Sequence, residues 1–283
     1  MPRGAGSATL FSKGRHLAAL YVWSFLEGYR RRKTLRGVER CCLFIGHPRS
    51  GHSLVGSLLD SHPDVVIAHE LDLVGLLKRF SRNQIFALVL RRDRMFTDAG
   101  STQARTGYDF SVPGQWQGRV RRLRVVGAKK GPRTAERLHR DPELIEQVRR
   151  KLAADLRVIH VLRNPYDNIS TIAGRVGITL ESAIEDYFRL CERLHEVRSN
   201  LADDELCTLR HEDFVKEAAV HLSELCMWLG VEPTEEYLRD AASVVFDEPR
   251  RTRSAAAWTP ELVARVDREM QGFDFLEGYS FDS

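Results

Sequence analysis

Cysteine is scarce in this sequence, and its spacing forms no recognisable framework. The 283 residues include five cysteines, and none belongs to a Cys-x-x-Cys pair. They are Cys41, Cys42, Cys191, Cys207 and Cys226. An odd number of scattered cysteines argues against both a disulfide framework and a zinc site. We therefore expect a reducing, cytoplasmic location and no bound metal.

A hydrophobic run long enough to span a bilayer is missing from the N-terminal region. The apolar run at residues 17–26 is shorter than the roughly 20 residues that a transmembrane helix needs. Its end, Ser24-Phe25-Leu26-Glu27, does not resemble the small-residue cleavage site of a secretory signal. The run therefore predicts neither a membrane span nor an export signal.

Charge of one sign dominates only near the N-terminus. The formal net charge of +4 is too modest to indicate nucleic-acid binding over the whole surface. Residues 3–36, in contrast, hold eight bases and the single acid Glu27. The bases are Arg3, Lys13, Arg15, Arg30, Arg31, Arg32, Lys33 and Arg36. We expect a helical basic segment at residues 1–38 and one domain at residues 39–283.

This basic segment has two interpretations. In the first, it is a surface helix that packs Leu17, Leu20, Tyr21 and Trp23 against the domain. In the second, it makes peripheral contact with a membrane. We favour the first interpretation, because helices with an apolar stripe usually bury that stripe against their own domain.

Short apolar runs that alternate with helical periodicity predict the fold. The runs at residues 41–45, 64–68, 124–128, 156–162 and 206–209 have the length and composition of buried strands. Helical spacing follows residue 52 and recurs at residues 142–154, 182–199, 213–229 and 260–271. The fold class is therefore α/β, a three-layer sandwich with a central parallel sheet flanked by helices. Residues 71–122, with mixed signals, are interpreted as an insertion on the side of an acceptor substrate.

The segment at residues 46–53 has the frame of a phosphate-binding loop. Gly46 and Gly51 form the pattern G-x-x-x-x-G between a strand and a helix, as in a Walker A loop. His52 stands at the position of the Walker lysine, which weakens a triphosphate-hydrolysing interpretation. The backbone N–H groups of residues 50–53 and the Arg49 cation still suit an anionic ligand. The segment therefore predicts an anion site, with a P-loop NTPase-like fold around it.

This loop resembles the 5′-phosphosulfate loop of sulfotransferases that use 3′-phosphoadenylyl sulfate (PAPS), whose usual form is P-[KR]-S-G-T-[TS]. The resemblance assigns Arg49, Ser50, Gly51, His52 and Ser53 to donor binding, although His52 replaces the usual threonine. It implies PAPS as donor co-substrate, a hydroxylated acceptor such as a small molecule, glycan or lipid, and no metal requirement.

A second motif resembles the 3′-phosphate motif of the same family. A strand runs into Arg163-Asn164-Pro165 and a helix, and Thr171 follows Arg163 by eight residues. The family pattern assigns the 3′-phosphate to Arg163 and Thr171, with Ser170 as the alternative. Independently of the family, an arginine at a strand end and a hydroxyl in the next helix can both donate to a phosphate.

Catalytic candidates follow two other predicted strands. Glu70 lies 21 residues after Arg49, a spacing similar to that of the base glutamate in tyrosylprotein sulfotransferases, and we take it as the general base. His69 and His47 are rival bases because imidazole titrates near neutral pH. Lys129, with Lys130 as the alternate, resembles the family lysine that contacts the transferred sulfuryl group.

One further resemblance lies in the C-terminal region. The basic run that contains Arg253, before Trp258, resembles the family's loop over the 3′-phosphate.

The leading interpretation of the sequence is a sulfotransferase acting on a hydroxyl of an unidentified acceptor. A degenerate P-loop kinase or nucleotide hydrolase is one alternative, and a non-catalytic nucleotide-binding module is another.

Overall fold

A computed structural model describes residues 5–101 and 108–283 of the chain. Residues 1–4 of the predicted basic segment, with Arg3, and residues 102–107 of the predicted insertion lie outside the described residues. At the centre is a sheet of β1 (Arg40–Ile45), β2 (Val65–His69), β3 (Val125–Lys129), β4 (Asp155–Leu162) and β5 (Leu206–Arg210). The strand order is β2-β3-β1-β4-β5, and every neighbouring pair is parallel.

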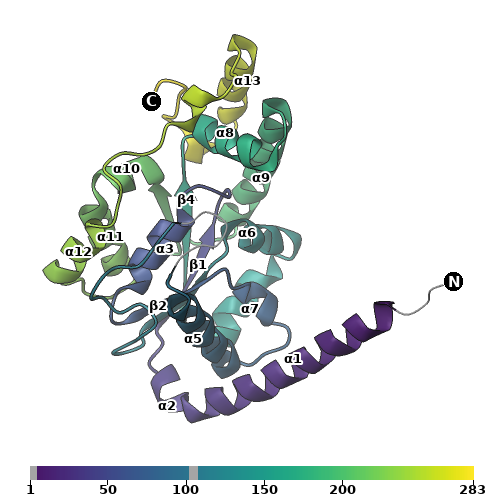
Figure 1. Cartoon of the computed structure of the whole chain (residues 1–283), viewed down its shortest axis with the longest axis vertical. Helices are drawn as coiled ribbons and strands as arrows, with labels where there is room; N and C mark the ends of the chain where they lie inside the picture. Colours follow the sequence, from purple (N-terminus) through teal and green to yellow (C-terminus); the bar gives the residue numbers. More distant parts are fainter. Residues whose placement is uncertain (1–4, 102–107) are drawn as a thin grey trace.

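Helices connect these strands and extend the chain at both ends (Figure 1). Before β3 they are α1 (Ala5–Arg30), α2 (Arg32–Leu35), α3 (His52–Asp60), α4 (Leu73–Leu76) and α5 (Arg82–Asp98). After β3 they are α6 (Gly131–Arg140), α7 (Glu143–Leu152), α8 (Pro165–Val176), α9 (Leu180–Ser199), α10 (His211–Lys216), α11 (Ala218–Trp228), α12 (Glu235–Ala242) and α13 (Pro260–Met270). Two short 3₁₀ helices span Thr252–Ala255 and Asp274–Leu276.

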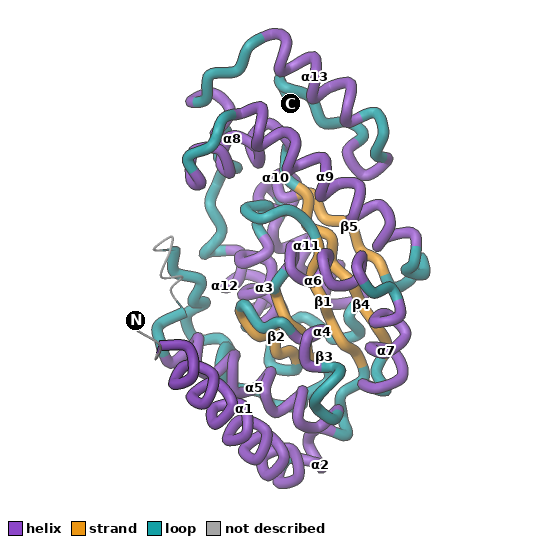
Figure 2. The backbone as a smooth tube through the Cα atoms, turned by 90° about the vertical axis from the view of Figure 1, so that its right-hand side faces the viewer, coloured by secondary structure: helices purple, strands orange, loops and turns teal. Residues whose placement is uncertain are grey.

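Both faces of the sheet are covered, and β1, β2 and β3 are buried almost throughout (Figure 2). Alternate residues of β1 enter different cores: Leu43 and Ile45 join one apolar cluster, and Cys42 and Phe44 join the other. Helices α5, α7 and α9 contribute to the first cluster, and α3 and α11 contribute to the second. This period-two division is the expected result of placing a strand between two helical layers. The predicted α/β three-layer fold is confirmed.

Helices α6 and α12 were not predicted from the sequence, but the boundaries of the predicted elements agree closely with the structure, with one exception. Each strand begins and ends within one residue of its predicted position. The single helix predicted at residues 213–229 is in fact two helices, α10 and α11. Glu217 separates them with φ −129° and ψ 50°, which lies outside the helical region. Apolar periodicity continues across this break, so the pattern alone did not indicate it.

Part of the 71–122 segment belongs to the helical layers of the sandwich. Helix α5 begins with a capping box in which Ser81 and Gln84 satisfy each other, and it packs against β2 and α1. Across residues 5–101 and 108–283, no helix combines the length and apolarity needed to cross a bilayer. Because the strands are parallel, their C-terminal ends meet at one edge of the sheet, where Gly46, Glu70, Lys130 and Arg163 follow β1 to β4. Ligands of such sheets bind at this edge.

Candidate functional site

The loop between β1 and α3 requires glycine at two positions. Gly46 has φ 129° and Gly51 has φ 100°, both in the region that side chains disfavour. A Cβ on Gly51 would lie 2.5 Å from His211 Nδ1, and one on Gly46 would lie 2.8 Å from Val161 O. The backbone therefore turns sharply and close to its neighbours. This turn directs the N-terminus of α3, with its unpaired N–H groups, toward the edge of the sheet.

The His52 side chain points away from this turn. Its Nε2 lies 2.9 Å from Ile45 O, and its ring packs edge-on to Phe44. Burial lowers the pKa of His52 to about 4, so the ring is neutral near pH 7. His52 therefore does not replace the Walker lysine as a cation, and only its backbone N–H is available for donor binding.

Lys129 supplies a cation to this part of the site from the end of β3. Its Nζ donates to Ser53 Oγ at 2.8 Å and to Glu70 Oε1 at 2.5 Å. The Lys129 side chain is 5% exposed and the Glu70 side chain 40%. Lys129 thus joins the first turn of α3 to the end of β2. Lys130 Nζ contacts the Glu70 carbonyl at 3.3 Å and lies outside this group.

The electrostatics keep Glu70 ionised. Burial acts to raise the pKa of Glu70, but the charge and hydrogen bond of Lys129 outweigh it, and the pKa is lowered from 4.5. For Lys129, burial is the dominant influence and lowers the pKa from 10.5, although Glu70 opposes that effect. The result is a carboxylate that is anionic at neutral pH, partly exposed, and beside a buried ammonium. Glu70 itself has φ 57°, a strained backbone conformation for a residue with a side chain.

The two rival histidine bases lie in different surroundings. His47 is 2% exposed, stacks on Tyr187 and contacts Tyr187 O at 2.9 Å, on the side of α9. His69 Nε2 lies 3.4 Å from Lys129 Nζ, and its ring stacks on Phe96 at 4.0 Å. Burial lowers the pKa of His69 to about 3 and that of His47 to about 4. The structure therefore brings His69 close to Glu70 and encloses His47 in the core.

The second motif forms a compact group of donors. Arg163 Nη1 donates to Thr171 Oγ1 at 3.2 Å and to Arg49 O at 3.3 Å, which connects the motif to the phosphate loop. Thr171 Oγ1 also lies 2.9 Å from Thr252 Oγ1. Ser170 points elsewhere: its Oγ donates to Tyr166 O at 2.7 Å and accepts from Trp258 Nε1 at 2.9 Å. Thr171, rather than Ser170, faces Arg163.

Several polar atoms of these motifs are buried without a partner. Within the described residues, Arg49 Nε, Arg163 Nε and Asn168 Oδ1 have no hydrogen-bond partner. An unsatisfied buried guanidinium N–H costs about 1–3 kcal/mol or more, so such atoms call for an explanation. Two of the three belong to the arginines that the sequence assigned to an anion. An anionic ligand here would accept hydrogen bonds from the Nε–H groups of these two arginines.

Sequence reasoning missed two residues at this site. Asn168 Nδ2 donates to Pro48 O at 3.1 Å and to Ser50 Oγ at 3.0 Å, so it holds the phosphate loop against α8. Thr252, in the first 3₁₀ helix, places a second hydroxyl beside that of Thr171. Asn168 lies inside the 163–171 motif and was thus within reach of the sequence analysis. Thr252 carries no local signal, because only the fold brings it beside α8.

Arg253 occupies an internal ion pair. Its Nη1 donates to Asp167 Oδ2 at 2.7 Å, its backbone N–H donates to Asp167 Oδ1 at 2.9 Å, and Nη2 contacts Ser283 O. Its side chain is 5% exposed. The pair fixes the 250–253 segment on α8. In a 3′-phosphate site, Arg253 would therefore position this segment rather than contact the phosphate.

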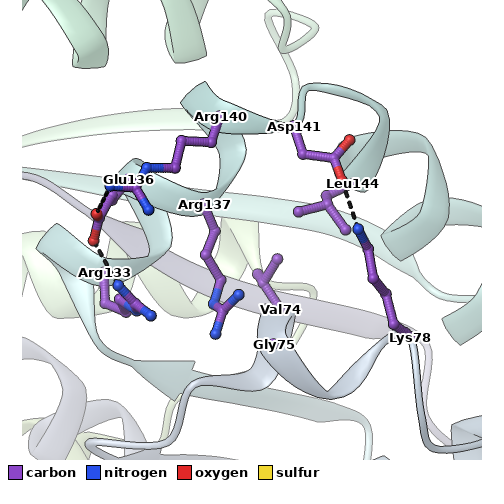
Figure 3. Close-up of a pocket in the computed structure, with 9 residues that line it drawn as sticks. All are labelled: Val74, Gly75, Lys78, Arg133, Glu136, Arg137, Arg140, Asp141 and Leu144. Carbon is purple, nitrogen blue, oxygen red and sulfur yellow. Dashed lines mark hydrogen bonds and ion pairs between the residues drawn. The ribbon is translucent and has the colours of Figure 1, made fainter.

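A small cavity of about 140 Å³ lies between α4, α6 and α7 (Figure 3). Four cations line it, and Figure 3 shows Arg133 and Arg140 bound to Glu136 and Lys78 bound to Asp141. Arg137 is bound to Asp72. These charges are therefore compensated from within the protein. The Arg49 guanidinium after β1, in contrast, has no ion pair with the described residues.

The arrangement defines an α/β protein of the P-loop-like class with a candidate anion site at the C-terminal edge of its sheet. Within the same described ranges, no group of three or more His, Cys, Asp or Glu side chains is placed to hold a metal ion. A family model described as the sulfotransferase family matches residues 43–236, more than half of the chain. The protein therefore belongs to the sulfotransferase family, as the two motifs predicted.

Among the solved structures similar to this chain, one with a TM-score of 0.50 supports the fold. Sulfotransferase STF9 from Mycobacterium avium is 13% identical, with a TM-score of 0.50 over 91% of this chain and 82% of that one. Sulfotransferase STF1 from Mycobacterium tuberculosis H37Rv is 12% identical, with a TM-score of 0.49 over 88% and 81%. Mouse sulfotransferase SULT7A1, complexed with PAP, is 11% identical, with a TM-score of 0.44 over 87% and 88%. No curated protein matches the chain in sequence.

Proposed function

We propose that this protein transfers a sulfuryl group from PAPS to a hydroxyl of an acceptor, with Glu70 as general base. The observation that carries the proposal is the position of Lys129, which contacts both Ser53 at the phosphate loop and Glu70 at the next strand end. A buried cation between an anion cradle and a carboxylate is the equipment that transfer of an anionic group to an alcohol requires.

The residues present fit the donor. Arg49 and the backbone N–H groups of residues 50–53 would hold the 5′-phosphosulfate, together with the positive end of α3. Arg163 and Thr171 would hold the 3′-phosphate. The unpaired Nε atoms of Arg49 and Arg163 support this assignment, since two anionic groups would satisfy them. When bound, PAPS supplies a sulfuryl group joined to a good leaving phosphate.

Each catalytic side chain then has a separate task. Glu70 accepts the proton of the acceptor hydroxyl as its oxygen bonds to sulfur. The ammonium of Lys129 and the guanidinium of Arg49 stabilise negative charge on the sulfuryl oxygens and on the departing phosphate oxygen. The sulfur–oxygen bond to the nucleotide breaks, and the products are the sulfated acceptor and adenosine 3′,5′-bisphosphate. The equivalent serine hydroxyl binds Mg²⁺ in Walker A proteins, whereas here the Ser53 hydroxyl accepts a hydrogen bond from Lys129. This contact supports a reaction without metal.

Aromatic rings support an acceptor site beside Glu70. Phe96 stacks on His69, and the Phe110 ring lies 6.3 Å from the His69 ring. Tyr108 and Phe246 lie 6.0 Å apart and contact the Arg250 guanidinium. Phe96, Tyr108 and Phe110 belong to the 71–122 segment, in keeping with an acceptor-side role. We expect a hydroxylated acceptor that presents an apolar surface to these rings.

The test combines ligand binding with product detection. Adenosine 3′,5′-bisphosphate should raise the melting temperature in the presence of a chelator, and ATP with Mg²⁺ should not. Incubation with PAPS and a mixture of hydroxylated compounds should yield products that gain one sulfuryl group, and Glu70→Gln should abolish them. Stabilisation by ATP with Mg²⁺ alone would instead indicate a degenerate kinase or hydrolase. Binding of the bisphosphate without any product from a broad acceptor set would indicate a non-catalytic binding module.

A further inference from the structure

The outward side of helix α1 carries a stripe of large apolar side chains. Val22, Phe25, Leu26 and Tyr29 are 57, 58, 62 and 63% exposed. Their spacing of three and four residues places them on one face of the helix. Four large apolar residues side by side on a surface are unusual for a face that contacts only water.

The opposite side of α1 is fixed to the domain, so the outward direction of the stripe is set by packing. Gln84 Nε2 donates to Tyr21 O and Ser24 Oγ, each at 3.2 Å. A Cβ on Gly28 would lie 2.9 Å from the Asn83 backbone, so the helix approaches α5 as closely as glycine allows. Any rotation of α1 that buried Phe25 would break these contacts.

This packing only partly matches the expectation from sequence. Leu20 and Trp23 are partly buried against the core, and Trp23 lies under the Arg91 guanidinium at 4.5 Å. Leu17 and Tyr21, also expected to pack, remain 44 and 47% exposed. The helix therefore uses its apolar residues on two sides, and the domain covers only one of them.

Cations follow the apolar stripe at its C-terminal end, and no carboxylate from residues 17–36 shares its face. Arg30 is 70% exposed, and Lys33 and Arg36 are exposed just beyond the helix. The one acid between residues 17 and 36 is Glu27, 16% exposed and bound by Arg30 and Arg31 on the inner side. Arg32 lies 4.3 Å above the Tyr29 ring. A cavity of about 560 Å³ beside α1 is lined by five arginines and three carboxylates.

Helix α1 lies away from the C-terminal edge of the sheet, where Glu70 follows β2. Figures 1 and 2 show α1 along the periphery, with α5 between it and the sheet. Helix α5 presents Arg91 to α1, whereas Arg92 donates to His69 O at 2.8 Å and Phe96 stacks on His69. A partner on the outer side of α1 is thus separated from Glu70 by the thickness of α5.

We propose that α1 docks in the plane of an anionic lipid surface. Val22, Phe25, Leu26 and Tyr29 enter the boundary between headgroups and acyl chains, and Arg30, Lys33 and Arg36 contact lipid phosphates. An apolar stripe flanked by bases is the pattern of interfacial helices, and each base near an anionic membrane adds about 1 kcal/mol of attraction. A second copy of this chain is a poorer occupant, because it would bring the Lys33 and Arg36 cations of two copies together.

Vesicle flotation tests the proposal directly with the full chain. The probes are phosphatidylcholine vesicles with and without about 30% phosphatidylglycerol, an anionic lipid that attracts bases. We expect flotation with the anionic vesicles, weaker flotation at about 0.5 M salt, and at least about tenfold lower partition to the neutral ones. Replacing Phe25 and Leu26 by Gln should reduce partition at least about tenfold. The charge variant Lys33→Glu with Arg36→Glu should reduce it ~25-fold or more, about fivefold for each charge removed.

Met227→Gln provides the matched control, because Met227 is an exposed apolar residue, 70% exposed, on α11. It should float like the unaltered protein, and circular dichroism should show that all variants keep their helix content. Equal binding to neutral and anionic vesicles, no binding to either, or full binding by both α1 variants would each overturn the proposal. Sedimentation showing a dimer that Phe25→Gln dissociates would overturn it in favour of a second copy.

Discussion

The ammonium of Lys129 lies 2.5 Å from Glu70 Oε1 and is joined in the same place to Ser53 Oγ. These residues come from the ends of β3 and β2 and from the first turn of α3. In a Walker A protein the equivalent serine hydroxyl binds Mg²⁺. Here the cation at this hydroxyl belongs to the chain, which couples the anion cradle to the carboxylate that we propose as base.

The first prediction separates Glu70 from its histidine rival. Glu70→Gln keeps the size of the side chain but removes the proton acceptor, and loss of a general base reduces turnover by ~10²–10⁴-fold. His69→Gln should change kcat by less than about tenfold, because neutral His69 serves to position Lys129 and Phe96 rather than to accept the proton. Single-turnover transfer of labelled sulfate measures both. A larger loss for His69→Gln than for Glu70→Gln would transfer the base assignment to the histidine.

The second prediction concerns pH. Because Lys129 holds the pKa of Glu70 below 4.5, kcat/KM should stay level from neutral pH down to about 4.5 and fall only at lower pH. The contribution of the lowered Glu70 pKa to the free energy of unfolding is likewise present above pH 4.5 and is lost as the pH falls and Glu70 is protonated. On the alkaline side, burial lowers the pKa of Lys129 from 10.5, so activity should decline before that pH. An acid limb near pH 6.5 would contradict Glu70 as the base, because a carboxylate with a pKa below 4.5 does not titrate there.

The sequence was sufficient for the sheet and for the positions of the two motifs at its edge. The run at residues 41–45 is apolar throughout and ends at Gly46, so its length and boundaries leave little choice but a buried parallel strand. The eight-residue interval from Arg163 to Thr171 likewise survives in space, because a strand end and the second turn of α8 form one rigid unit. Local rules apply wherever neighbours in sequence remain neighbours in the fold.

Contacts between segments that are distant in sequence could not be predicted. The inward turn of His52 depends on the carbonyl of Ile45 and the close approach of Gly131, which a loop pattern does not encode. Thr252 reaches Thr171 across 81 positions of sequence. The outward face of α1 was equally hidden, since an amphipathic pattern does not say which of two apolar sides a domain will cover.

The third prediction tests the 3′-phosphate contacts. Thr171→Ala should weaken binding of adenosine 3′,5′-bisphosphate by ~10–100-fold, the usual cost of a hydrogen bond to a charged group, and leave adenosine 5′-phosphate binding unchanged. Ser170→Ala is the matched control: it deprives Trp258 Nε1 of its acceptor and should lower stability by about 1 kcal/mol without altering that preference. Calorimetry with both nucleotides decides. If Ser170→Ala alone removes the preference, the two residues exchange their assignments.

The last prediction concerns the shape of the phosphate loop. Gly51 has φ 100°, and an added Cβ would meet His211 Nδ1 at 2.5 Å. Gly51→Ala should therefore lower the free energy of unfolding by about 1–3 kcal/mol and weaken anion binding. Gly174 is the opposite case, because it lies inside α8 and a Cβ added there would have no other atom within 4 Å. Gly174→Ala should raise the free energy of unfolding by ~0.5–1 kcal/mol, because alanine favours the helix.

A double-mutant cycle divides the Gly51 effect into its two causes. If the contact with His211 dominates, His211→Ala should restore much of the stability lost in Gly51→Ala, and the two changes will not be additive. If the backbone conformation dominates, His211→Ala should restore nothing, because alanine remains disfavoured at φ 100°. Urea unfolding of the four proteins gives the coupling free energy. A Gly51→Ala protein as stable as the unaltered chain, with undiminished binding of adenosine 3′,5′-bisphosphate, would mean that the sharp turn is not required for the anion site.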